Sequence, residues 1–193
     1  MEKGTLFILS APGGTGKTTL AHRLINSFDN VVKSVSLTTR KKRPGEVCGI
    51  DYVFTDRPSF EKKIAEDAFM ECSEVFGNWY GVEKSRVFAA LNQGKHVILV
   101  IDVQGAVKIQ KQLDVVSIFV SPPSMDELKK RLEGRKSGPA DLEMRLKAAH
   151  SEMQMIDHYD HHVINDSLEA ALEELKTIFI QSGANPKQEP KKL

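Results

Sequence analysis

A glycine-rich run near the N-terminus has the residue types that bind the phosphates of a nucleotide. Ala11-Pro-Gly-Gly-Thr-Gly-Lys17-Thr18 follows an apolar segment and precedes a helical one. Its glycines permit backbone angles that turn successive N–H groups toward an anion, and the N-terminus of the following helix adds partial positive charge. Lys17 can reach the β- and γ-phosphates, and the Thr18 hydroxyl can coordinate Mg²⁺. A flexible glycine turn is the alternative, but the order of strand, loop and helix favours nucleotide binding.

The elements around this loop follow the pattern of an α/β fold with a parallel sheet. Continuous apolar runs at residues 5–10, 96–101 and 115–120 each lead into a helical segment. Strands without apolar and polar alternation are buried on both faces, as in a parallel sheet. A last short strand near 162–164 precedes a helix over 167–182. The sequence therefore predicts a three-layer core with the glycine-rich loop at one edge of its sheet.

The stretch between residues 34 and 94 has a different pattern. Short alternating segments at 34–38, 51–54 and 69–71, with a helix near 59–66, predict an inserted α+β lobe. Residues 124–147 have the composition of a small helical lid, and the Pro/Lys-rich tail at 183–193 is expected to be disordered. We expect one domain over 1–182, with its core at 1–33, 95–123 and 148–182.

Composition limits the classes of function. The 193 residues are 40% hydrophobic and 27% charged, with a formal net charge of +1, so no overall field attracts nucleic acid or membrane. No run approaches the roughly 20 apolar residues of a membrane span, and the N-terminus lacks the pattern of a signal peptide. Cys48 and Cys72 are either two free thiols or one bridge, and free thiols suit a reducing compartment. We expect a cytoplasmic protein with neither nucleic-acid nor membrane partners.

The segment after the first helix carries a family resemblance. Ser34-Val-Ser-Leu-Thr-Thr-Arg40-Lys-Lys-Arg43-Pro-Gly-Glu46-Val-Cys-Gly49-Ile-Asp51-Tyr52 resembles the nucleotide-binding segment of guanylate kinases, and the rest of the chain resembles that family nearly end to end. The resemblance implies a P-loop nucleoside monophosphate kinase that transfers the γ-phosphoryl group of ATP to GMP and dGMP, giving ADP and GDP. It also implies Mg²⁺ as cofactor, ATP and GMP as small-molecule partners, a role in guanine nucleotide recycling, and a monomer or homodimer.

The same resemblance implies how the GMP phosphate is held. In the family, the positions matching Arg40, Arg43, Tyr52 and Tyr80 bind this phosphate. The chemistry agrees, because guanidinium groups bind phosphate bidentately and phenol hydroxyls complete its hydrogen bonds. The alternative for the basic run is a solvated segment or a nucleic-acid patch, which a short run in a near-neutral chain disfavours.

Base recognition is implied at three further positions. Guanine presents N1–H and N2–H₂ as adjacent donors, and a carboxylate that accepts both discriminates against adenine. Glu71 and Asp102 match family positions with this role, and Ser36 matches a further base contact. Without the resemblance, Glu71 would be read as a surface carboxylate. The chain departs from the family at Val82, where Ser or Thr usually contacts the guanine O6, and at Val100, where an acidic residue is common.

The lid and the ATP side complete the predicted site. In relatives, arginines at the positions of Arg131, Arg135 and Arg145 close over the transferring phosphoryl group, whose spread negative charge they meet. Asn165 matches an adenine contact, with a plain loop residue or helix cap as the alternative. The predicted catalytic residues are Lys17, Arg40, Arg135 and Arg145. The predicted ATP-binding residues are Ala11, Pro12, Gly13, Gly14, Thr15, Gly16, Lys17, Thr18, Thr19, Arg131 and Asn165.

Two other functions and one other site remain open on the sequence alone. A guanylate-kinase-like module that binds phosphorylated peptides would have lost the phosphate loop, which Lys17 and Thr18 oppose. A kinase for a different phosphorylated acceptor is opposed by Glu71 with Asp102 and is left open by Val82. A metal site built from His158, His161 and His162 has no further ligand nearby.

Overall fold

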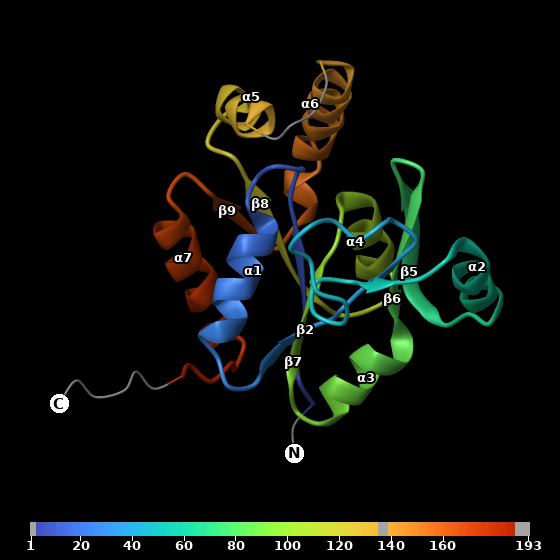
Figure 1. Cartoon of the computed structure of the whole chain (residues 1–193). Helices are drawn as coiled ribbons and strands as arrows, with labels where there is room; N and C mark the ends of the chain where they lie inside the picture. Colours follow the sequence, from blue (N-terminus) through green and yellow to red (C-terminus); the bar gives the residue numbers. More distant parts are fainter. Residues whose placement is uncertain (1–2, 135–138, 188–193) are drawn as a thin grey trace.

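The computed structural model describes residues 3–134 and 139–187 and contains a five-stranded parallel sheet (Figure 1). Its strand order is β2-β7-β1-β8-β9, so the first strand lies at the centre. The apolar run at the N-terminus forms this central strand, and all five of its residues are buried. The strands are β1 (Leu6–Ser10), β2 (Val31–Lys33), β7 (His96–Val100), β8 (Val116–Ser121) and β9 (His161–Ile164).

Helices cover both faces of this sheet, which confirms the predicted three-layer α/β core (Figure 1). On one face, α1 (Lys17–Asn26) and α7 (Leu168–Gln181) bury Leu20, Leu24 and Phe179 against the strands. On the other, α3 (Lys84–Asn92) and α4 (Val103–Gln110) bury Leu91 and Ile109. Because parallel strands end at the same edge, the loops after β1 and β7 meet there and form the floor of the site.

The inserted lobe has its own mixed sheet, in the order β4-β3-β6-β5. A small aromatic core holds it together, since Phe60 of the lobe helix stacks on Phe69 with their ring centroids 4.5 Å apart. Gly81 lacks a side chain where a Cβ would lie 2.7 Å from the Phe69 ring, so this close packing requires glycine. The elements are β3 (Leu37–Thr38), β4 (Val53–Phe54), α2 (Arg57–Ala65), β5 (Phe69–Val75) and β6 (Asn78–Glu83).

The lid consists of two helices above the sheet edge, α5 (Met125–Glu133) and α6 (Pro139–Met153) (Figure 1). Ser124 caps α5 by accepting the backbone N–H of Glu127, as its sequence pattern predicts. Leu128 and Leu132 are fully buried against Ala149 of α6, so the two helices share a core. A 3₁₀ turn, η1 (Ile156–His158), follows and leads into β9.

Several strands, helices and segment boundaries of the structure differ from those predicted from the sequence. No prediction marked β2, β6 or α3, and α3 packs on the core sheet although the lobe was expected to extend to residue 94. The expected end of the lid at 147 falls inside the continuous helix α6.

The expected disorder of the tail is wrong for its first residues. Ala184 is buried, Pro186 forms a β-bridge with Phe28, and the backbone N–H of Asn185 donates to Asn30 Oδ1 at 2.8 Å. Residues 188–193 lie outside the described part. Among the helices of residues 3–134 and 139–187, none has the length and hydropathy needed to cross a bilayer.

Candidate active site

The glycine-rich loop leaves the N-terminus of α1 open to an anion. Gly16 is the N-cap residue and supplies no side-chain cap, and no acidic residue lies in the first turn. The N–H groups of that turn therefore keep their capacity to bind phosphate. Gly14 and Gly16 have φ of +100° and +94°, which favours glycine, whereas Gly13 has no positive φ and open space around its Cβ position. Two of the three predicted glycine requirements thus have a structural basis.

Two predicted ATP-binding residues hold this loop in place. Asn165 is buried in the loop after β9, and its Nδ2 donates to the Thr15 carbonyl at 2.6 Å. The helix cap is instead Ser167. Arg131 donates from Nη1 to the Asn165 carbonyl at 3.0 Å and pairs with Glu127, so it braces the loop indirectly. Their predicted contacts with ATP stay predictions.

Lys17 extends from α1 to the edge of the central sheet. Its Nζ donates to the Ile101 carbonyl at 2.8 Å, at the end of β7. Burial lowers the pKa of Lys17, while Asp102 and Glu152 partly oppose this shift. Glu152, on α6, has its pKa raised to about 7 by burial, with Lys17 opposing the rise. The ammonium group therefore lies among main-chain oxygens, and phosphate oxygens could accept its remaining hydrogen bonds.

Half of the predicted site residues, including all those predicted to bind GMP, line one cavity between lobe, core and lid. Its volume is about 410 Å³, and it is lined by residues from all three parts of the chain. Sequence-distant elements supply them: α1, the segments around β3 and β4, both strands of the β5–β6 hairpin, the end of β7, and α6. The predicted residues that line it are Lys17, Thr18, Ser36, Arg40, Arg43, Tyr52, Glu71, Tyr80, Asp102 and Arg145.

Two arginines predicted to bind the GMP phosphate, Arg40 and Arg43, line the cavity. The guanidinium of Arg40 forms a bidentate pair with Glu46, at 2.7 Å from Nη2 to Oε1 and 3.1 Å from Nη1 to Oε2. The backbone N–H of Arg43 also donates to Glu46 Oε2, at 2.8 Å. Burial alone would raise the pKa of Glu46, but its bonds with Arg40 and Arg43 lower it below the usual value. Glu46 therefore stays ionised and fixes both arginines.

The sequence alone does not indicate this role of Glu46, because the ion pair depends on a loop that brings it onto Arg40. Replacing Glu46 by alanine should raise the KM for GMP about tenfold, because Arg40 loses the partner that orients its guanidinium. E46Q, which keeps one acceptor and the side-chain shape, should have a smaller effect. Steady-state kinetics at saturating ATP measure this, with Glu61→Ala on the exposed face of α2 as the matched control. An unchanged KM in E46A would contradict the orienting role.

The cavity is also lined by a buried carboxylate, Glu71, that has an oxygen without a hydrogen-bond partner. The Glu71 side chain is 3% exposed and its Oε1 has no hydrogen-bond partner; the nearest cation, Lys108 Nζ, is 4.0 Å away. Burial raises the pKa of Glu71 to about 7, and the charge of Asp102 adds to the rise. Such an acceptor is costly unless a ligand supplies donors. Two adjacent N–H groups of a base would supply them.

This pKa predicts a pH dependence of GMP binding. Two base donors favour the ionised form of Glu71, so binding releases a proton wherever the free carboxyl is protonated. With a pKa of about 7, affinity should fall about fourfold as pH falls from 8 to 6.5. Isothermal titration with GMP in two buffers of different ionisation enthalpy measures both the affinity and the number of protons released. E71Q should flatten the profile, and a flat wild-type profile would contradict this role.

Asp102 has contacts that the predicted base-reading role did not include. It caps α4, with Oδ1 accepting the Gly105 N–H at 2.8 Å, and Oδ2 accepts the Ser73 hydroxyl at 3.2 Å. Gly105 is required beside it, because a Cβ there would lie 2.7 Å from Glu71 Cδ. Ser73 was not predicted, and it links the lobe to the core at this point. A direct contact of Asp102 with the base stays a prediction.

The two departures from the family pattern both lie on the cavity wall. Val82 is buried and pairs across the strands with Glu71, so an apolar side chain adjoins the carboxylate. Val100 also lines the cavity, at the end of β7 near Thr18.

Within residues 3–134 and 139–187, no cluster of three or more acidic, His or Cys side chains is arranged to hold a metal. The three histidines predicted as an open metal alternative therefore form no site; His162 Nε2 lies 2.8 Å from Ser121 Oγ.

Of the lid arginines, Arg145 reaches the cavity from α6. Its Nε donates to Asp141 Oδ2 at 2.8 Å, which fixes the direction of the side chain. Arg135, predicted as catalytic, lies outside the described residues. Both cysteines are free thiols, so the alternative of one bridge is not present.

Comparisons with known proteins agree with this geometry. The model of the guanylate kinase family matches residues 3–182. The guanylate kinase of Protochlamydia amoebophila is 45% identical over 180 residues, covering 93% of this chain and 91% of the relative. That of Hydrogenovibrio crunogenus is 45% identical over 179 residues, covering 92% and 87%. The crystal structure of guanylate kinase from Anaplasma phagocytophilum aligns with a TM-score of 0.79 at 36% identity, covering 93% and 86%. The chain belongs to the guanylate kinase family.

Proposed function

We propose that this protein is an ATP:GMP phosphotransferase, which transfers the γ-phosphoryl group of ATP to GMP and gives ADP and GDP. The observation that carries the proposal is one cavity with two kinds of polar group. It is lined by cations, Lys17 of the phosphate loop together with Arg40 and Arg43, and by the buried, incompletely bonded carboxylate of Glu71. A nucleoside monophosphate with adjacent base donors fits this distribution, and dGMP fits it equally because the ribose 2′-hydroxyl is not part of that pattern.

Catalysis by these residues is alignment and charge neutralisation. The acceptor phosphate has a second pKa of about 6, so its attacking oxygen is already an anion at neutral pH and needs no general base. Arg40, Arg43, Tyr52 and Tyr80 would orient it, and the loop with Lys17 would hold the donor phosphates in line. Arg145 would meet the charge that spreads over the transferring group. Closure of lobe and lid would exclude water, which otherwise hydrolyses ATP.

The oxygen ligands at the cavity wall suit a Mg²⁺ ion that is bound together with the phosphates of a nucleotide. Mg²⁺ keeps several waters and needs few protein oxygens when phosphates supply the rest. Thr18, beside Lys17 at the cavity wall, offers a hydroxyl oxygen, and Asp102 is the nearby carboxylate. When bound, the ion would neutralise charge on the donor phosphates. The free thiols Cys48 and Cys72 support the cytoplasm as the compartment.

A product analysis tests this proposal. The protein with Mg-ATP and GMP should form ADP and GDP in equal amounts, resolved by ion-exchange chromatography, and ADP should not form without GMP. Removal of free metal with a chelator should stop both products. ADP formed at the same rate with and without GMP would identify an ATP hydrolase and overturn the proposal.

A further inference from the structure

The tip of the β5–β6 hairpin has an unfavourable residue at an unfavourable backbone position. Val75 pairs with Asn78, so the turn consists of Phe76 and Gly77, and both have positive φ, +49° and +75°. Two-residue turns of this kind favour Asn-Gly, because a bulky side chain with positive φ is strained. Asn78 Nδ2 supports the turn by donating to the Phe76 carbonyl at 3.0 Å.

Phe76 also gains little from burial, because it is 53% exposed. A large apolar side chain that is both strained and half in water is not explained by the stability of the hairpin. Strain of this type is found where a residue is held for a functional contact. The contacts of the Phe76 ring should therefore indicate its function.

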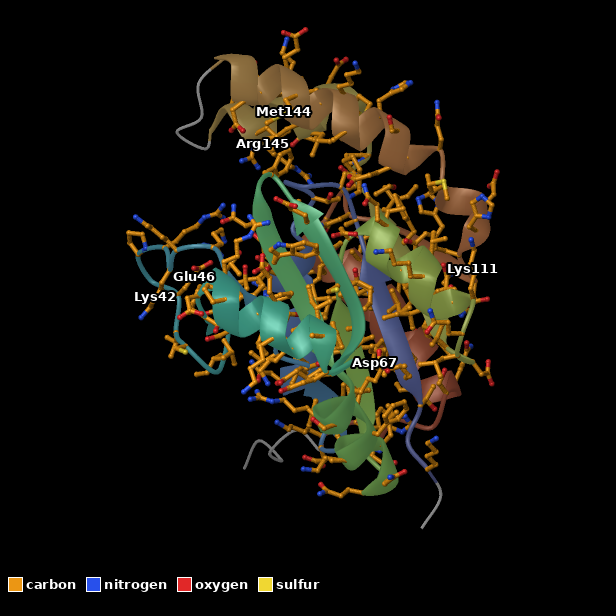
Figure 2. All side chains as sticks on the ribbon, turned by 90° about the vertical axis from the view of Figure 1, so that its right-hand side faces the viewer. Lys42, Glu46, Asp67, Lys111, Met144 and Arg145 are labelled. Carbon is orange, nitrogen blue, oxygen red and sulfur yellow. The ribbon has the colours of Figure 1, made fainter. Side chains whose placement is uncertain are left out.

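The ring of Phe76 faces the lid. The guanidinium carbon of Arg145 lies 5.4 Å from the ring centroid, within the range of a cation–π contact. Figure 2 shows Arg145 on the side of α6 that faces the hairpin tip. Both residues line the main cavity, and the Arg145 side chain is only 26% exposed. Asp141 Oδ2 accepts the Nε–H of the same guanidinium at 2.8 Å.

We propose that Phe76 is a positioning residue for Arg145, and that this contact couples the GMP-binding lobe to the lid. Asp141 fixes the guanidinium from within α6, while Phe76 fixes it from the lobe that carries the acceptor. The inference rests on the proposed function, since Arg145 acts there on the transferring phosphoryl group. Binding of the acceptor and placement of this arginine then depend on one another through a single aromatic contact.

Phe76→Asn separates positioning from structure, because Asn-Gly is the favoured sequence for such a turn. We expect F76N to unfold at the same temperature as wild type or higher, while kcat falls about tenfold and the KM for GMP changes less than threefold. F76L, which is apolar but has no ring, should show a similar decrease in kcat. F76Y, which keeps an aromatic ring, should have the kcat of wild type. Ile64→Ala, an exposed apolar residue elsewhere in the lobe, is the matched control and should match wild type.

A double-mutant cycle and a signal without turnover complete the test. In an R145A background, F76N should cause no further loss of kcat. In NMR spectra of the protein alone, F76N should shift the Arg145 Nε–H resonance, because the ring current is removed. Full kcat in F76N or F76L, an equal loss in the R145A background, or an unshifted resonance would each overturn the proposal. Absence of phosphoryl transfer in wild type would reject the proposed function instead, while the NMR shift would still test the contact.

Discussion

Lys17→Ala should lower kcat about 10³-fold while GMP still binds with near wild-type affinity. Lys17 is the cation that extends from the phosphate loop to the sheet edge, and its ammonium group donates to the main-chain oxygens of Ile101 and Ala11. Its removal would leave the charge that develops on the β- and γ-phosphates without its nearest partner. We expect GMP to be held by Arg40, Arg43 and Glu71 rather than by Lys17, so its affinity should persist.

The fold should tolerate this change. Burial lowers the pKa of Lys17, which means that keeping it charged costs folding free energy, so K17A should not lower the unfolding temperature. Lys176→Ala on the surface of α7 is the matched control and should leave kcat unchanged. Single-turnover kinetics with titration of GMP measure the two effects separately. A kcat within threefold of wild type in K17A would remove Lys17 from the phosphate-binding role.

Glu71→Ala should lower kcat/KM for GMP about 10³-fold and leave the weak reaction with AMP nearly unchanged. We expect the buried Oε1 without a partner to select a base with adjacent donors. In E71A, no carboxylate at this position accepts the donors of guanine, so kcat/KM for GMP should fall close to kcat/KM for AMP. Val82, which adjoins Glu71 across the strands, offers no hydrogen bond in its place. A preserved preference for GMP in E71A would assign base reading to another group.

Stability measurements on E71Q distinguish lost recognition from misfolding. The pKa of Glu71 is about 7 in the folded protein, above its usual 4.5. A raised carboxyl pKa favours folding below the unfolded pKa, and this contribution is lost as pH rises from about 4.5 to 7. E71Q, which cannot ionise, should therefore unfold at a higher temperature than wild type at pH 8 and differ little at pH 5. Thermal unfolding followed by circular dichroism at both pH values checks this.

Local sequence determined much of the site. The phosphate loop needs only a buried strand, glycines and a helix start, all contiguous, and its geometry follows except at Gly13. The basic segment after Arg40 was predictable from its residue types and family resemblance. These features depend on neighbours along the chain, where spacing alone limits what the backbone can do.

Contacts between distant segments were not predictable in the same way. Phe76 meets Arg145 across 69 positions, and the sequence gives no sign that an aromatic residue would occupy a turn that favours asparagine. The paired role of Glu46 depends on a loop that bends back onto Arg40. The Pro and Lys residues of the tail suggest disorder, whereas the buried Ala184 fixes its first residues to the core.

The most direct measurement is ADP production from Mg-ATP with GMP, dGMP, AMP, UMP, CMP and IMP in parallel, beside a control without acceptor. We predict rapid ADP formation with GMP and dGMP, slower formation with IMP, which lacks one of the two donors that Glu71 accepts, and background rates with the others. Such a result would also show that Val82 does not prevent guanine recognition. Equal rates with AMP and GMP, or background rates with every acceptor, would contradict the guanine-specific phosphotransferase described above.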